Sequence, residues 1–205
     1  MKKGLFITFE GADGCGKTTQ SKLVQKYLEE KGYTVIWTRE PGSAGLGQKI
    51  RELLLHYEGD VAPMCEAFLF LADRAQHIEH IIKPAVKEGK IVICDRHTDS
   101  TIAYQGYGRG EDIPQLKSLN NLATGGLKPD LTFVFDVSTE VAQKRVGSEK
   151  DRMEAEGIEF HKKVRNGYLE IARQEPDRVK IVNADNDIET VFEDTKKILD
   201  TILNK

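Results

Sequence analysis

The chain has 205 residues, of which 39% are hydrophobic and 31% are charged, and its formal net charge is −3 at pH 7. This length suits one folded domain with a substantial core, and this composition excludes a disordered chain. Because a near-neutral protein has no general attraction for a nucleic-acid backbone, we expect a small phosphorylated ligand rather than a nucleic acid.

The cysteines and the N-terminal segment indicate the cellular setting. Cys15, Cys65 and Cys94 are far apart and odd in number, which argues against a disulfide framework and against a zinc site. The first apolar run ends at Glu10, which is too short for a signal-peptide core or a membrane span. We therefore expect a cytoplasmic protein with no membrane partner.

Short apolar segments alternate along the chain with longer segments of helical period, which predicts βαβ units and a parallel sheet. The expected strands cover residues 5–9, 34–38, 91–95, 131–136 and 179–183. The expected helices cover residues 17–31, 46–56, 65–88 with a kink at Pro84, 113–124, 139–146, 160–174 and 188–203. No linker divides the pattern, so residues 1–205 are expected to form a single domain, with a charged, mobile excursion at residues 147–157.

The first expected strand runs into a loop of the pattern G-x-x-x-x-G-K-[ST] and then into a helix. The loop residues are Gly11, Ala12, Asp13, Gly14, Cys15, Gly16, Lys17 and Thr18. In such a loop the backbone N–H groups surround phosphates, Lys17 reaches the outer phosphates, and the Thr18 hydroxyl can ligate Mg²⁺. The order strand, loop, helix favours a nucleoside triphosphate site over an ordinary glycine-rich turn.

Two residues inside this loop are unusual. A carboxylate at Asp13 would repel phosphates unless it faced a metal ion or a hydroxyl group, so we expect it to face a second substrate. A solvent-facing turn residue is the alternative. Cys15 is expected to be a small filler residue, with a redox-sensitive thiol near a helix N-terminus as the alternative.

The turn after the second expected strand, Arg39-Glu40-Pro41-Gly42, can aim Arg39 at the same cavity. The alternative is an exposed loop arginine, and the isomer of the Glu40–Pro41 bond stays open.

On the long expected helix, Phe70, Arg74 and His77 fall at i, i+4 and i+7, on a different stripe from the apolar positions. An aromatic face beside a guanidinium suits a planar base, because Phe70 can stack on the ring while Arg74 donates to a carbonyl oxygen. A core position for Phe70 is the alternative. His77 is assigned to the surface or to the surroundings of the site.

Asp95 and Arg96 end the third expected strand, at the edge where ligands of open α/β sheets gather. Asp95 could hold Mg²⁺ directly or through water, and Arg96 could clamp a phosphate. The alternative is an aspartate that caps the next segment, with Arg96 in solvent.

Together these residues resemble the thymidylate kinase family, whose members transfer a phosphoryl group from ATP to dTMP to give dTDP in dTTP biosynthesis. The resemblance spans nearly the whole chain, through FEGADGCGKTTQ, TREPG, FLFLADRAQH, CDRHTDSTIAYQG, KPDLTFVFDV and DRMEAEGIEFHKKVRNGYLEIA. It implies an α/β P-loop NTPase fold of three layers, with a five-stranded parallel sheet flanked by helices and a short mobile lid at about residues 147–157. It also implies Mg²⁺ as cofactor, ATP and dTMP as ligands, and a homodimer.

The resemblance also implies a role for each site residue. It places residues 11–18 at the ATP phosphates, Arg145 beside adenine, Asp95 with Thr18 at the metal, and Asp13 at the sugar 3′-hydroxyl. For the acceptor, it implies phosphate clamps at Arg39 and Arg96, a thymine stack and carbonyl contact at Phe70 and Arg74, base-edge contacts at Ser100, Thr101 and Gln105, and a ring that disfavours a 2′-hydroxyl at Tyr104.

The variable positions of the phosphate loop hold no arginine, so the chain resembles the bacterial type of the family, in which the lid supplies that cation. Arg152 is the first candidate and Lys150 the second, with a charged loop of no catalytic role as the alternative. The resemblance thus implies five catalytic residues, namely Asp13, Lys17, Arg39, Arg96 and Arg152.

Two rival functions remain at this stage. A related kinase could act on another nucleoside monophosphate, or on a nucleoside, whose alcohol would need a general base. A GTPase switch or an ATP-dependent binding module would not need a second base site, and the chain has no N-K-x-D guanine signature.

Overall fold

Five strands form one parallel sheet in the computed structural model, which describes residues 4–43, 45–145, 147 and 151–203. The strand order is β2-β3-β1-β4-β5. The strands are β1 (Leu5–Glu10), β2 (Val35–Arg39), β3 (Ile91–Asp95), β4 (Leu131–Asp136) and β5 (Val179–Asn183). All five expected strands are confirmed, with ends that differ by at most one residue from the expectation.

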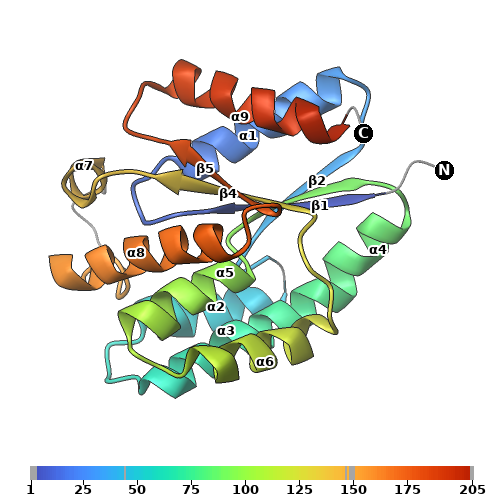
Figure 1. Ribbon diagram of the computed structural model, residues 1–205. Helices are drawn as coiled ribbons and strands as arrows, with labels where there is room; N and C mark the ends of the chain where they lie inside the picture. The colour runs from blue at the N-terminus through green and yellow to red at the C-terminus, as the bar shows by residue number, and fades with distance from the viewer. Residues whose placement is uncertain (1–3, 44, 146, 148–150, 204–205) are drawn as a thin grey trace.

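Helices cover both faces of the sheet and make three layers (Figure 1). One face carries α1 (Lys17–Glu30) and α9 (Ile188–Leu203); the other carries α2 (Leu46–His56), α3 (Pro63–His77), α4 (Lys83–Lys87), α6 (Ile113–Thr124) and α8 (Ile158–Gln174). The short α7 (Thr139–Arg145) follows β4. The expected three-layer P-loop fold with a five-stranded parallel sheet is therefore confirmed.

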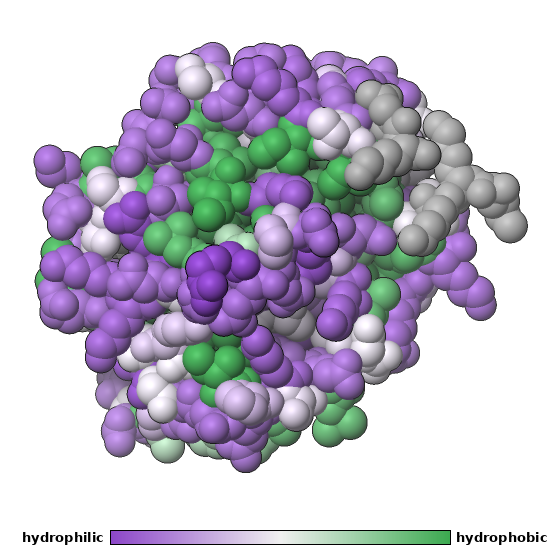
Figure 2. All heavy atoms as spheres, in the orientation of Figure 1, coloured by the Kyte–Doolittle hydropathy of each residue, from purple (hydrophilic) through white to green (hydrophobic). Residues whose placement is uncertain are grey.

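Burial of the strands explains why their sequences are almost continuously apolar. Every residue of β3 is buried, and so are five of the six in β1. Apolar side chains of α1 and α9 pack on one side of the sheet, where Val24, Leu28 and Leu199 join Phe9 and Phe133. Hydrophilic side chains predominate on the face of the molecule seen in Figure 2, and the hydrophobic ones gather in a band close to the sheet.

The long helix expected over residues 65–88 is interrupted. It consists of α3, a π-helical turn (Ile78–Ile82) and α4, and Pro84 lies in the first turn of α4. Since proline has no N–H and its ring crowds the preceding turn, a regular α-helical ladder cannot run through this point. The expected kink is therefore realised as a wider turn just before the proline.

A second helical segment was not expected from the sequence. The short α5 (Thr98–Thr101) continues into a π-helix, η2 (Ile102–Gly108). Its sequence mixes β-branched, aromatic and glycine residues without an apolar stripe of period 3.6, so helical periodicity gave no signal. This segment lies directly after β3 and supplies part of the site described below.

The strand ends determine where the site lies. In the register of the sheet, Asp95 of β3 pairs with Phe9 of β1 and with Arg39 of β2. The carboxyl ends of these three strands therefore bring the phosphate loop, Arg39 and Asp95 to one edge of the sheet.

Candidate active site

A cavity of about 180 Å³ opens at the carboxyl ends of β1, β2 and β3. Most of the residues expected at the nucleotide sites line it, namely Asp13, Lys17, Thr18, Arg39, Phe70, Asp95, Arg96, Ser100, Thr101, Tyr104 and Gln105. These residues come from the phosphate loop, β2, α3, the end of β3 and the segment after it, so the fold brings together residues that are far apart in the sequence.

The backbone of the phosphate loop adopts conformations that glycine allows and other residues rarely adopt. Gly11, Gly14 and Gly16 all have positive φ, at 142°, 79° and 85°. A Cβ at Gly11 would lie 2.7 Å from the Phe135 carbonyl oxygen and 2.8 Å from Cys15 Sγ. Cys15 is buried, and burial raises the pKa of its thiol, so it is the expected filler residue rather than a reactive thiolate.

Asp13 points into the cavity and is not a solvent-facing turn residue. Its carboxylate accepts hydrogen bonds from Arg96 at 2.5 Å and from the Tyr104 hydroxyl at 2.7 Å, and it lies 3.7 Å from Lys17 Nζ. Burial alone would raise the pKa of Asp13, but the charges of Arg96 and Lys17 hold it well below its ordinary value. The phosphate loop therefore carries a carboxylate that faces Arg96, the residue after β3. The contact of Asp13 with a sugar hydroxyl stays a prediction.

Thr18 and Asp95 meet at the base of the cavity, where the Thr18 hydroxyl donates a hydrogen bond to the Asp95 carboxylate. Asp95 is not a helix cap, because α5 begins after His97 without a side-chain cap. A hydroxyl and a carboxylate next to a phosphate loop form the oxygen donor set that Mg²⁺ prefers. The residues present thus fit the expected metal.

Arg96 has the only left-handed backbone among the non-glycine residues that the structure describes, with φ of 70°. Its guanidinium bonds the Gly11 carbonyl oxygen at 3.0 Å and the Tyr168 hydroxyl at 3.2 Å, besides Asp13. Burial would lower the pKa of Arg96, but Asp13 raises it well above the ordinary value. The arginine is therefore a fixed cation on the wall of the cavity rather than a solvent-exposed side chain.

Glu10 is a buried acid that sequence reasoning did not assign to the site. It accepts hydrogen bonds from the His97 N–H at 2.8 Å, from the Ser100 hydroxyl at 2.6 Å and from the Tyr168 hydroxyl at 3.1 Å. Burial and the nearby Asp99 raise its pKa from 4.5 to about 7. One feature of the sequence could have indicated this role: Glu10 is an acidic residue at the end of an apolar strand, immediately before the phosphate loop.

Arg39 and Arg51 add further positive charge. Arg39, the last residue of β2, is exposed and lines the cavity, and the Glu40–Pro41 bond that follows is cis. Arg51 of α2 also lines the cavity, and it donates to the Pro41 carbonyl oxygen at 3.0 Å. Burial and the charge of Arg39 lower the pKa of Arg51. No motif in the sequence indicated Arg51, because only the packing of α2 on α3 brings it to the cavity.

Arg74 takes part in a buried network behind the cavity wall. It donates to Glu40 at 2.9 Å, to Thr101 at 2.7 Å and to Asn120 at 2.6 Å. Its side chain is almost fully buried and does not line the cavity, whereas Phe70, one turn earlier, does. The expected contact of Arg74 with a base carbonyl therefore stays a prediction, and Thr101 lies between this guanidinium and the cavity.

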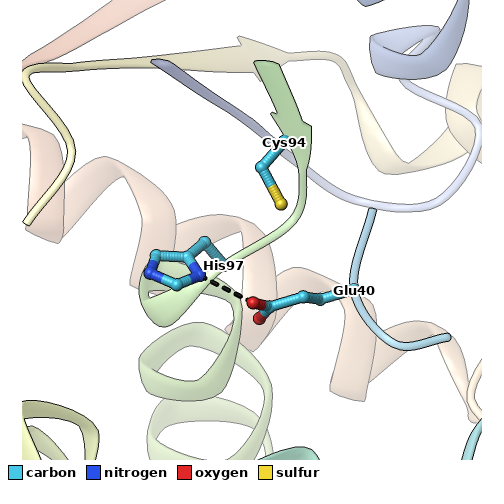
Figure 3. A group of neighbouring side chains, drawn as sticks. All are labelled: Glu40, Cys94 and His97. Atoms are coloured by element: carbon cyan, nitrogen blue, oxygen red, sulfur yellow. Dashed lines mark hydrogen bonds and ion pairs between the residues drawn. The ribbon is translucent and has the colours of Figure 1, made fainter. Parts of the chain in front are cut away.

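Glu40 is the centre of that network. His77 and His97 each bond its Oε1 at 2.9 Å, and Figure 3 shows His97 pointing at this carboxylate below Cys94. Burial would raise the pKa of Glu40, but Arg74 and His97 hold it well below its ordinary value. Of the two places expected for His77, the surface is wrong because the residue is buried, and its bond to Glu40 puts it in the surroundings of the site. Cys94 lies beside Glu40 and His97, where burial raises the pKa of its thiol and the thiol donates to the Arg96 carbonyl oxygen at 3.0 Å.

Two expected residues lie away from the cavity. Arg152 does not reach the phosphate loop: its guanidinium pairs with the buried Glu66 at 2.6 Å and donates to the Leu54 carbonyl oxygen at 2.9 Å. Arg145 donates to the Ala184 carbonyl oxygen at 2.9 Å. Lys150, the second candidate for the lid cation, lies outside the described residues, as do positions 148 and 149 of the expected lid.

The parallel sheet, the phosphate loop and the cavity that this loop lines define the protein as a P-loop nucleotide kinase. The sequence profile of the thymidylate kinase family matches residues 9–195. The chain is 47% identical to the thymidylate kinase of Maridesulfovibrio salexigens over 209 residues, which cover 97% of this chain and 96% of that one. It is 48% identical to the thymidylate kinase of Geotalea daltonii, with 91% of this chain and 92% of that one covered.

A solved structure agrees with these sequence matches. The crystal structure of thymidylate kinase from Ehrlichia chaffeensis superposes with a TM-score of 0.79 at 40% identity, over 96% of this chain and 98% of that one. The chain belongs to the thymidylate kinase family. It is an enzyme that phosphorylates dTMP to dTDP with ATP, as the sequence resemblance implied.

Proposed function

We propose that the cavity holds dTMP with its phosphate among Arg39, Arg96 and Lys17, facing the γ-phosphate of an ATP bound along residues 11–18. One observation carries this proposal: Arg96, at the end of β3, bonds both Asp13 and the Gly11 carbonyl oxygen of the phosphate loop. The arginine that would hold the acceptor is therefore in direct contact with the loop that would hold the donor.

Electrostatics is the main obstacle that these side chains would overcome. The second pKa of a phosphate monoester is about 6, so near pH 7 the acceptor is already largely the dianionic nucleophile and needs no general base. Two anionic nucleotides must then approach in line, and positioned cations stabilise that arrangement. Lys17, Arg39 and Arg96 line the same cavity, and Arg51 adds a fourth positive charge.

Thr18 and Asp95 would hold the metal. Phosphoryl transfer from ATP generally uses a divalent cation, and we assign Mg²⁺ because the available donors are oxygens. When bound, the ion supplies positive charge to the phosphate oxygens. Asp95 would act directly or through water, and Thr18 through the hydroxyl that now bonds Asp95.

The other half of the cavity would hold the nucleoside of dTMP. Phe70 would stack on thymine, while Ser100, Thr101 and Gln105 line the wall where the edge of the base would lie. Asp13 would accept a hydrogen bond from the sugar 3′-hydroxyl. Tyr104, whose hydroxyl is held by Asp13, would leave no room for a 2′-hydroxyl.

Arg145 and Arg152 would act on the ATP side. We assign Arg145 to adenine and Arg152, in a mobile lid at residues 147–157, to the phosphates, with Lys150 as the second candidate. Because Arg152 pairs with Glu66 in the structure, this role requires that ion pair to open when both nucleotides bind. Hydrogen exchange at residues 151–157 should then slow on bisubstrate binding, and unchanged exchange would contradict lid closure.

We further propose that residues 1–205 act as one kinase domain in a cytoplasmic homodimer. Exposed apolar side chains on three helices that pack in series support the dimer: Leu53 of α2, Phe68 of α3 and Leu122 of α6 are 51%, 53% and 78% exposed. The free cysteines suit a reducing compartment. A solution mass of one chain at micromolar concentration would contradict the dimer.

None of the helices in the described ranges is long and apolar enough to cross a membrane.

A coupled assay of ADP release tests the site assignment. With ATP and Mg²⁺, we expect rapid turnover with dTMP, slower turnover with dUMP, UMP and AMP, and none with thymidine, which lacks the phosphate that the cations hold. Chelation of the metal should stop the reaction. Equal turnover with thymidine, or ADP release that needs no acceptor, would overturn the assignment.

A further inference from the structure

Glu66 is a fully buried acid on α3 that does not line the cavity. Its carboxylate accepts hydrogen bonds from the Gln105 side-chain amide at 2.8 Å and from Arg109 at 3.2 and 3.3 Å, and it pairs with Arg152 at 2.6 Å. Phe70 lies one helical turn further along α3, so Glu66 and Phe70 share a face of that helix.

The chemistry of these partners determines how the amide of Gln105 is oriented. The Glu66 carboxylate already accepts hydrogen bonds from Arg109 and pairs with Arg152, so it meets its neighbours as an acceptor. Gln105 must therefore turn its NH₂ group toward Glu66, as the structure has it. Its carbonyl oxygen is then left for the cavity, which Gln105 lines together with Phe70 and Thr101.

We propose that Glu66 is a positioning residue that makes the acceptor site selective for thymine over cytosine. Thymine carries an N–H donor at N3, which matches the carbonyl oxygen of Gln105. Cytosine carries an unprotonated acceptor at N3, so it would place two acceptors face to face in a buried site. This inference rests on the proposed placement of the base against Phe70.

The primary test is the ratio of kcat/KM for dTMP to kcat/KM for dCMP in the wild-type protein and in Glu66→Gln. The variant keeps the shape of the side chain, but its amide can offer Gln105 either an oxygen or an NH₂ group, so the orientation of Gln105 is no longer fixed. We expect the ratio to fall by about 10-fold to 100-fold, mainly through KM. An unchanged ratio, or equal losses for both substrates, would overturn the proposal.

Asp99→Asn is the matched control. Asp99 is also a buried acid paired with an arginine, Arg178 at 2.8 Å, and its side-chain hydrogen bonds go to Arg178 and Thr132 rather than to Gln105. We expect it to lower the midpoint of urea unfolding as Glu66→Gln does, while the dTMP to dCMP ratio stays at the wild-type value. A fall in the ratio of similar size in this control would show that loss of stability alone changes selectivity.

The double variant Glu66→Gln with Gln105→Glu exchanges the two groups. Residue 105 is then the acceptor-only carboxylate, held by the amide of residue 66, and it again presents an oxygen to the base. We expect the preference for dTMP to return. If Glu66→Gln does not fold, the double variant is the test. A double variant that folds but does not prefer dTMP over dCMP would contradict the proposed orientation of Gln105.

The activity of the wild-type protein on dTMP and dCMP shows whether a failure concerns the role of Glu66 or the proposed site itself. A wild-type protein that does not phosphorylate dTMP would end the site assignment. A wild-type protein that phosphorylates dTMP and dCMP equally well would end only the role of Glu66.

Discussion

The two ends of the cavity are built differently. At the phosphate end, the cations Lys17, Arg39 and Arg96 line the cavity. Five carboxylates also line the cavity, those of Asp13, Glu40, Asp95, Asp151 and Glu154. At the base end, the charged groups, Glu66 and Arg74, lie behind the wall and are satisfied by other protein groups. Charge thus faces the ligand at one end and supports neutral groups at the other.

This difference indicates a division of work. A phosphate is recognised by net charge, so cations in the open cavity gain most when the ligand arrives. A base is recognised by the pattern of its donors and acceptors, so the protein must fix the orientation of neutral amides and hydroxyls in advance. Substitutions at the phosphate end should therefore change turnover, and substitutions behind the base end should change selectivity or stability.

The largest expected effect is at the phosphate end. Arg96→Ala removes a cation that contacts the phosphate loop, and arginines in phosphoryl transfer contribute about 10³-fold to 10⁵-fold in rate. We expect turnover of dTMP to be abolished while ATP still binds, as measured by the coupled assay and by calorimetry. Arg96→Lys, which keeps the charge but not the planar fork, should recover part of the rate; unchanged turnover in Arg96→Ala would remove Arg96 from the mechanism.

Glu40→Ala tests the buried network. It would leave the guanidinium of Arg74 buried without its carboxylate, and such a loss costs about 3–5 kcal/mol. We expect the urea midpoint to fall accordingly. The exposed pair of Lys26 and Glu30 gives the control, since Glu30→Ala should change stability by less than about 0.5 kcal/mol. Equal effects of the two substitutions would contradict the importance of the network.

Glu10 gives a prediction for pH dependence. Its pKa in the folded state is about 7 against an ordinary value of 4.5, so between these two values the folded chain holds a proton that the unfolded chain has lost. The contribution of Glu10 to stability therefore falls as pH rises from 4.5 to 7, by up to about 3 kcal/mol. In Glu10→Gln the fall should be smaller, as measured by urea unfolding at pH 5 and pH 7.5, and the remaining part includes Asp73, whose pKa burial raises to about 6. An identical slope in both proteins would contradict the raised pKa.

The smallest expected effect concerns Arg51, which lines the phosphate end from α2 but contacts Pro41 rather than the phosphate loop. Arg51→Gln should raise the KM for dTMP by about 3-fold to 10-fold, with little change in kcat, because a remote charge contributes mainly to binding. A drop in kcat as large as that of Arg96→Ala would place Arg51 in the reaction itself.

The sequence predicted some parts of the molecule better than others. The strands and the phosphate loop were predicted closely, because apolar runs and a glycine pattern are local signals. Phe70 and Asp95 were also placed correctly at the cavity. Glu10, Glu66 and Arg51 were missed, since their positions depend on which helices pack together, and no local pattern encodes that packing.

Arg74 and Arg152 show the limit of the resemblance. It implied that both act on nucleotides, but it carried no information about their protein partners. The structure pairs Arg74 with Glu40 and Arg152 with Glu66, because buried carboxylates without a cation would be costly. Residues that resemble a family motif can therefore support the site from behind as well as touch the ligand.

A crystal structure with dTMP and a nonhydrolysable ATP analogue tests the division of the cavity most directly. We expect the dTMP phosphate between Arg39 and Arg96, its thymine ring against Phe70, and the carbonyl oxygen of Gln105 at N3 of the base. A cavity beneath Phe70 that is filled by the protein's own side chains, or dTMP bound with its base toward the phosphate loop, would contradict the account.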